Sequence, residues 1–220
     1  MAFNRGAVGI YEDSMTAFRS GDTELAEEFA LELLGELSYD DEVGGHLGSR
    51  VDALCMLARV ALRRGDFWKV SSLAEEAWAV SLGAVERREE MMLKRMPIHL
   101  LAAGARMRGE YAEARMLYLE SIELNRELGE DGMVAAEHRN LGYVELHDGQ
   151  VARARELFAL AAKEDALGPY AVLDAAVVAL EDGDRRKARE LASWFAAAGL
   201  VLDPDDAAEL EALQLRLRES

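Results

Sequence analysis

Cysteine and proline are scarce in this chain of 220 residues, and long hydrophobic runs are missing. The single cysteine, Cys55, excludes an internal disulfide, which fits a reducing compartment. The longest apolar candidate, AVLDAAVVAL at 171–180, is too short for a membrane span and is interrupted by Asp174. The first residues, MAFNRGAVGI, lack the continuous apolar core of a signal peptide. We therefore expect a soluble, cytoplasmic protein.

Positive charge is also in short supply. The chain has 25 Lys and Arg against 42 Asp and Glu, which gives a formal net charge of −17. A surface of this sign repels a phosphate backbone over most of its area and resists anionic lipid. The composition therefore predicts neither direct nucleic-acid binding nor membrane binding.

Catalytic motifs are missing as well. The sequence has no G-x-S-x-G elbow, no Walker glycine loop, no H-E-x-x-H and no paired C-x-x-C. The four histidines show no metal-ligand spacing, because the closest pair, His138 and His147, would point to opposite sides of a helix. We expect a protein that is not an enzyme and that holds neither a metal nor another cofactor.

What the chain does contain favours helix. Only three prolines and 7% aromatic residues stand beside abundant Ala, Leu, Glu and Arg. With half of its residues hydrophobic, a chain of this length can bury a core as one domain or one short repeat array. The composition predicts an all-α fold.

Five glycines each follow one helical pattern and precede another. They are Gly21, Gly65, Gly109, Gly149 and Gly183, and the differences between successive numbers are 44, 44, 40 and 34. Periods of this size indicate stacked helical hairpins. We expect each glycine to end the first helix of a pair at a positive φ, which a residue without a Cβ adopts freely.

Small and slender residues recur at fixed distances after these glycines. The fifth residues are Ala26, Val70, Ala114, Ala154 and Ala188, the ninth are Ala30, Ala74, Tyr118, Phe158 and Ala192, and the twelfth are Leu33, Ala77, Ser121, Ala161 and Phe195. Offsets of four and three place these positions on one face of a helix, where a small residue lets a neighbouring helix approach.

This pattern resembles the tetratricopeptide repeat (TPR). One good copy is Asn140-Leu141-Gly142 with Gly149, Ala154, Phe158 and Ala161, and a second is Gly109, Tyr111, Ala114, Tyr118 and Ser121. The segment around them also resembles the longer-period repeats that form sensor arms of bacterial signal-transduction regulators. The resemblance implies a right-handed α-solenoid, and the family includes adaptors, chaperone partners and regulators.

The expected organisation is a single domain, 1–220, of about five antiparallel helix hairpins and a C-terminal capping helix. The hairpins are expected at about 5–37, 48–82, 87–128, 132–164 and 169–198, and the capping helix at 204–218. Leu210, Leu213 and Leu217 of the last helix would cover the final hairpin, because a terminal repeat needs a face suited to solvent.

The resemblance also implies a concave groove lined by the first helix of each hairpin. The matching positions that we take as candidate binding residues are Cys55, Arg59, Arg63, Met96, His99, Arg106, Met107, Arg139, Tyr143 and His147. Arginine suits carboxylate recognition, and Met and Tyr offer adaptable apolar contact. A structural role remains an open alternative, because Arg also neutralises neighbouring acids and Met is often filler in repeat arrays.

One stretch stands out by its charge. The interval from Asp22 to Glu42 holds nine acids and no Lys or Arg. It is either a solvated outer face or a docking surface for a basic partner.

These patterns favour a non-enzymatic module that binds a protein or peptide segment in the groove, with a regulatory role as one option. If Arg59, Arg106 and Arg139 face one groove, the partner would be acidic or would bear a carboxylate. The alternative is a self-associating scaffold, a homo-oligomer without a groove ligand.

Overall fold

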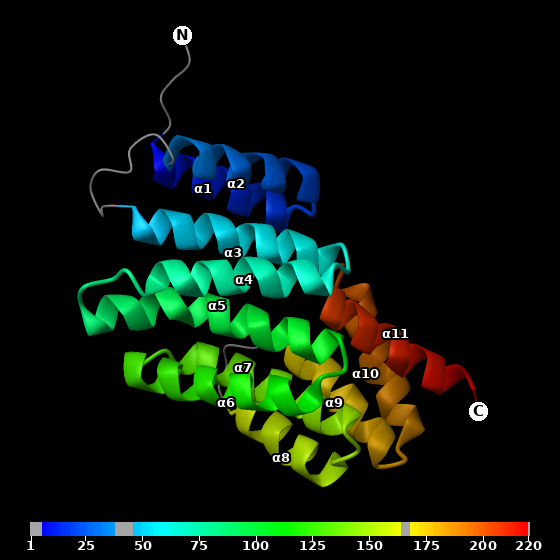
Figure 1. The fold of residues 1–220 in the computed structure, drawn as a ribbon. Helices are drawn as coiled ribbons and strands as arrows, with labels where there is room; N and C mark the ends of the chain where they lie inside the picture. Colours follow the sequence, from blue (N-terminus) through cyan, green and yellow to red (C-terminus); the bar gives the residue numbers. More distant parts are fainter. Residues whose placement is uncertain (1–5, 38–45, 164–167, 220) are drawn as a thin grey trace. The chain divides into compact units, whose positions relative to one another are not determined.

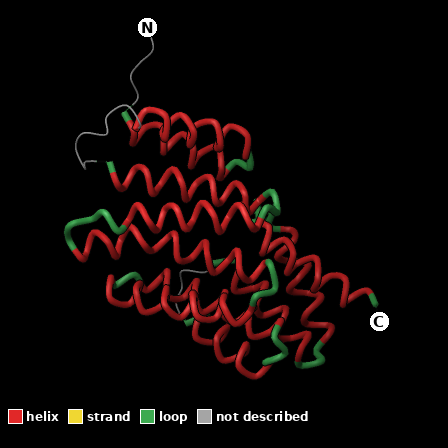
Figure 2. The backbone as a smooth tube through the Cα atoms, viewed as in Figure 1, coloured by secondary structure: helices red, strands yellow, loops and turns green. Residues whose placement is uncertain are grey.

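The computed structural model describes residues 6–37, 46–163 and 168–219, and within these ranges the chain forms eleven α-helices and no strand (Figure 2). The helices are α1 (Ala7–Arg19), α2 (Thr23–Leu37), α3 (Leu47–Arg63), α4 (Phe67–Ser81), α5 (Arg87–Met107), α6 (Tyr111–Leu128), α7 (Asp131–His147), α8 (Val151–Ala161), α9 (Tyr170–Glu181), α10 (Arg185–Ala197) and α11 (Pro204–Arg218). The all-α prediction is confirmed, and the bounds of the five hairpins stay a prediction. Residues 5 and 164, which were expected at hairpin ends, lie outside the described ranges.

The chain divides into two compact units. Unit 1 is Met1–Arg108, with α1 to α5, and unit 2 is Gly109–Ser220, with α6 to α11. We describe each unit by itself, and the expectation of a single domain stays a prediction.

The turns at the repeat glycines have the backbone that the glycine spacing predicts. The five repeat glycines have φ values of 74° to 88°. At Gly65, the N–H of Gly65 bonds to the carbonyl of Leu62 and the N–H of Asp66 bonds to that of Ala61, which is a Schellman ending. Asp66 then caps the next helix by accepting a hydrogen bond from the N–H of Lys69 at 3.1 Å.

Helix α3 is the centre of unit 1. It packs against α1, α2, α4 and α5, and the five helices lie side by side in Figure 1. Ten of its residues are buried, which explains why its apolar positions run almost all the way round rather than along one stripe. Phe18, Ala30, Met56 and Val60 belong to one hydrophobic cluster that joins α1, α2 and α3.

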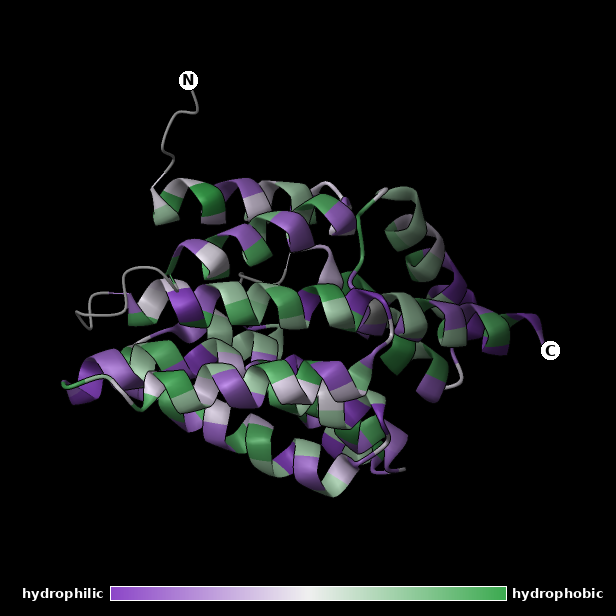
Figure 3. Cartoon of the chain, turned by 45° about the horizontal axis from the view of Figure 1, so that its top comes forward, coloured by the Kyte–Doolittle hydropathy of each residue, from purple (hydrophilic) through white to green (hydrophobic). Residues whose placement is uncertain are grey.

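Unit 2 continues the same pattern. Helix α7 packs between α6 and α8, α9 pairs with α10, and α11 packs on both α9 and α10. Leu213 and Leu217 of α11 are buried in the same cluster as Phe158 and Phe195, and Leu210 packs against it. The predicted cover of the last hairpin is therefore confirmed. Figure 3 shows the alternation of hydrophobic and hydrophilic residues around the helices.

The positions five, nine and twelve residues after the repeat glycines are all buried. The closest approach is at Gly142 of α7, where an added Cβ would lie 2.7 Å from Cε1 of Phe158 in α8. Glycine at this position lets the backbone of α7 approach the Phe158 ring. The close packing of α7 on α8 therefore depends on the missing side chain of Gly142.

Candidate functional site

Helices α1, α3 and α5 of unit 1, each the first helix of a predicted hairpin, line one pocket of about 130 Å³. Its walls include Tyr11 from α1, Asp52, Cys55 and Arg59 from α3, and Met96 from α5. These helices come together because α3 packs against both α1 and α5. Three candidate residues, Cys55, Arg59 and Met96, therefore lie at one pocket.

The pKa values of three acidic groups of this pocket, on Tyr11, Asp52 and Cys55, are raised, which favours their neutral forms. Burial raises the pKa of the Asp52 carboxyl above its ordinary value. Burial and then the charge of Asp52 raise the pKa of the Tyr11 hydroxyl. Burial, followed by the same carboxylate, raises the pKa of the Cys55 thiol, which therefore stays protonated and is a poor nucleophile.

Arg59 and Arg63 both stack on the ring of Phe18 from α1. The guanidinium carbon lies 4.4 Å from the ring centroid for Arg59 and 3.4 Å for Arg63. Arg63 also donates to the carbonyl oxygen of Phe18, and Arg59 donates to Sδ of Met15 at 3.5 Å. These contacts fix α3 to α1, and of the two arginines only Arg59 lines the pocket.

The other candidates of α5 lie outside this pocket's lining. Arg106 is buried, while His99 and Met107 are half-buried. Arg59 and Arg106 belong to unit 1 and Arg139 belongs to unit 2. A common face for the three arginines therefore stays a prediction.

In unit 2, the candidates on α7 contact other helices of their own chain. Nε of Arg139 lies 2.9 Å and 3.0 Å from the two carboxylate oxygens of Asp174 in α9. Its Nη2 forms an ion pair with Oδ1 of Asp206 in α11 at 2.7 Å. The hydroxyl of Tyr143 donates to Asp174 at 2.7 Å. The third candidate on α7, His147, has its Nε2 2.7 Å from Oε1 of Glu209 in α11.

Burial governs the electrostatics of this cluster. It raises the pKa of Asp174, although Arg139 and the Tyr143 hydroxyl act in the opposite direction. The facing carboxylates keep the pKa of Arg139 well above its ordinary value in spite of burial. Helix α11 thus supplies carboxylates to Arg139 and His147 of α7. In the α7 part of the predicted groove, these two basic side chains therefore pair with acids of the same chain.

The sequence contained one signal for this cluster. Asp174 interrupts an otherwise apolar helix, and a buried carboxylate requires a partner. Its partners could not be read from the sequence, because Arg139 and Tyr143 lie 35 and 31 positions earlier on another helix. The pairing depends on how α7, α9 and α11 pack.

Within the described ranges, three or more His, Cys, Asp or Glu side chains nowhere gather in a way that could hold a metal ion. The helices in those ranges also include none whose length and apolar character would suit a membrane crossing.

No protein-family model matches the sequence, and no curated protein matches it. Solved structures do resemble it. A Rap protein complexed with Competence and Sporulation Factor has a TM-score of 0.70 at 19% identity, covering 96% of this chain and 57% of that one. The apo form of RapI has a TM-score of 0.64 at 15% identity, covering 86% of this chain and 68% of that one.

Kinesin light chain TPR-like repeats of Podosopora anserina have a TM-score of 0.62 at 17% identity, covering 100% of both chains. At such identities the likeness concerns the fold, and the fold of this chain is TPR-like. The chain spans little more than half the length of the Rap protein in the complex. The likeness to sensor arms of bacterial regulators stays a prediction.

Proposed function

We propose that this chain is a non-enzymatic module that binds a segment of a protein or peptide on the face formed by α1, α3 and α5. The observation that carries the proposal is the single pocket that these three first helices line. A protein of similar fold, the Rap protein, has been solved with Competence and Sporulation Factor, and this supports a binding role for the fold.

The chemistry of the pocket favours an acidic segment with one apolar side chain. Its charged lining residues are Asp52, Arg59 and Arg95, a net charge of +1 (2 − 1). Arginine binds carboxylates through paired hydrogen bonds, and Met92 and Met96 offer an adaptable apolar wall. A volume of about 130 Å³ is close to that of cavities of roughly 150 Å³ that take up benzene, so one side chain fits.

The composition indicates the class of partner and the compartment. A net charge of −17 disfavours direct nucleic-acid and membrane partners, and one cysteine without a disulfide favours the cytoplasm. Over most of such a surface an acidic segment is repelled, so a locally positive pocket favours its binding at this face.

The test uses the full chain and a phage-displayed peptide library. The strongest selected peptide is labelled, and its dissociation constant is measured by fluorescence anisotropy for wild type and two matched variants. Met92 lines the pocket and is 50% exposed, whereas Met116 lies on α6 and is 66% exposed. Met92→Glu should weaken binding at least about tenfold, and Met116→Glu should leave it unchanged.

A selected peptide that loses affinity equally in both variants, or whose binding is indifferent to salt, would contradict the proposal. Selection of basic rather than acidic peptides would contradict the proposed ligand chemistry.

A further inference from the structure

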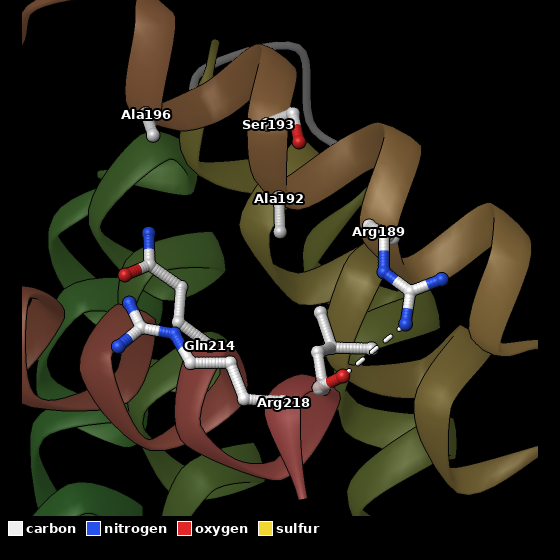
Figure 4. A pocket seen from close by; sticks show the side chains of 7 residues that line it. Arg189, Ala192, Ser193, Ala196, Gln214 and Arg218 are labelled. Atoms are coloured by element: carbon white, nitrogen blue, oxygen red, sulfur yellow. Dashed lines mark hydrogen bonds between the residues drawn. The ribbon is translucent and has the colours of Figure 1, made fainter. Parts of the chain in front are cut away.

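A second pocket lies between α10 and α11 of unit 2, and none of the candidate binding residues lines it. It is an open trough of about 430 Å³ with an apolar floor of Ala192, Ala196 and Leu217. Arg189 and Arg218 line it together with Ser193 and Gln214. Figure 4 shows Arg189 and Ala192 of α10 facing Gln214 and Arg218 of α11 across this trough.

The two helices that line the trough are rich in basic residues at one end. Helix α10 begins with Arg185, Arg186, Lys187 and Arg189, and α11 ends with Arg216 and Arg218. Positive charge in the first turn of α10 opposes the helix dipole, so local helix stability does not explain this placement. Arg185 and Arg189 donate to the carbonyl oxygens of Arg216 and Leu217, which accounts for those two. Among the described residues, Arg218 forms no ion pair.

The opposite charge is concentrated on α2 of unit 1. Glu24, Glu28 and Glu32 recur every four residues and are exposed, and α2 contains no Lys or Arg. Leu31, which is 54% exposed, lies at the edge of this stripe, one turn after Glu28. An exposed leucine beside a row of carboxylates is chemically complementary to an apolar floor beside two arginines.

We propose that the trough of one copy of this chain binds α2 of a second copy. Leu31 enters the floor, where the small side chains of Ala192 and Ala196 let a helix approach closely. Glu28 and Glu32 then reach Arg189 and Arg218, whose guanidinium groups bind carboxylates. The two surfaces differ and lie on different helices, so the contact is heterologous, and each added copy leaves one trough and one α2 stripe open.

The net charge of −17 on each copy opposes association at long range. At physiological ionic strength, however, charges more than about 8 Å apart are largely screened, and the close pairs at the trough are screened less. Association is therefore expected to weaken both at very low salt and at high salt. This inference does not rest on segment binding in unit 1, because it uses none of that pocket's residues.

The experiment is sedimentation velocity of the full chain over a range of concentrations. The trough variant is Arg189→Glu with Arg218→Glu, and the stripe variant is Glu28→Arg with Glu32→Arg. Each alone places like charges opposite each other and should weaken association at least about tenfold. Mixing the two variants restores opposite charges in reversed order and should restore association.

Matched controls come from α8, where Arg153 and Glu156 are both exposed and form an ion pair with each other. Arg153→Glu and Glu156→Arg should sediment like wild type. A wild type that stays monomeric at every concentration would overturn the proposal. So would association that the trough and stripe variants leave unchanged, or a mixture that stays monomeric although circular dichroism shows both variants folded.

Discussion

Gly142→Ala is expected to destabilise the chain, although Ala is normally the better helix residue. Gly142 lies inside α7, and an added Cβ would lie 2.7 Å and 2.8 Å from two carbons of the Phe158 ring. The ring has little room to move, because Phe158 is buried and packs edge-on against Tyr143 at 4.9 Å between centroids.

The magnitude follows from two opposing effects. Replacing Gly by Ala inside a helix contributes about 1 kcal/mol of stability. Overpacking a rigid core costs about 1–3 kcal/mol, and the short distances at Gly142 favour the upper part of that range. We expect a net loss of about 1–2 kcal/mol. Gly35 is the matched control, because it lies inside α2 with nothing within 4 Å of an added Cβ, so Gly35→Ala should stabilise by about 0.5–1 kcal/mol.

Urea unfolding followed by circular dichroism measures both variants, with separate transitions fitted separately if the two units unfold apart. In a Phe158→Leu background, Gly142→Ala should become neutral or stabilising, which gives a coupling energy of about 1–3 kcal/mol. If Gly142→Ala stabilises the wild-type background as Gly35→Ala does, the close contact between α7 and α8 is refuted.

Three further outcomes are expected. Ala154→Leu should cost about 1–3 kcal/mol by overpacking, because Ala154 is 1% exposed in the core of unit 2, and an unchanged melting temperature would contradict this. Asp174→Ala should cost about 3–5 kcal/mol, because it leaves Arg139 without its main buried partner, whereas Arg126→Ala breaks an exposed pair and should cost less than about 1 kcal/mol in the same urea titration. Asp52→Asn should stabilise the protein near neutral pH and lose this advantage in acid. Burial raises the folded-state pKa of Asp52, so wild type loses stability as pH rises through that pKa, and a difference that grows toward low pH would be evidence against this.

The repeat could be predicted from the sequence because its determinants are local. A glycine at positive φ and a small residue five positions later are requirements of one turn and one helix contact, and both recur at Gly21, Gly65, Gly109, Gly149 and Gly183. The all-α class and the covering role of Leu213 and Leu217 follow from the same periodicity.

The side-chain environments could not be predicted in the same way. The resemblance implied one set of candidate positions on every first helix, but Arg59 stacks on Phe18 beside a pocket whereas Arg139 lies in a buried ion pair. The difference comes from neighbouring helices. A capping helix with Asp206 and Glu209 in its first two turns packs onto unit 2, and sequence periodicity does not reveal which carboxylate reaches which arginine.

The same difference decides which surface an acidic segment would prefer. The unit 1 pocket has a net charge of +1, whereas a pocket of unit 2 lined by α7, α8, α9 and α11 contains His147 and the charged residues Glu181, Glu209 and Arg216, and these three sum to −1 (1 − 2). Both carboxylates of the latter already pair, Glu209 with His147 and Glu181 with Arg216. An acidic ligand there would have to displace these internal pairs and would then leave two carboxylates facing it. At the unit 1 pocket, the ligand's carboxylate would instead meet a local excess of positive charge, so that selectivity between the two surfaces arises from the acids of α11 as much as from the arginines of α3 and α5.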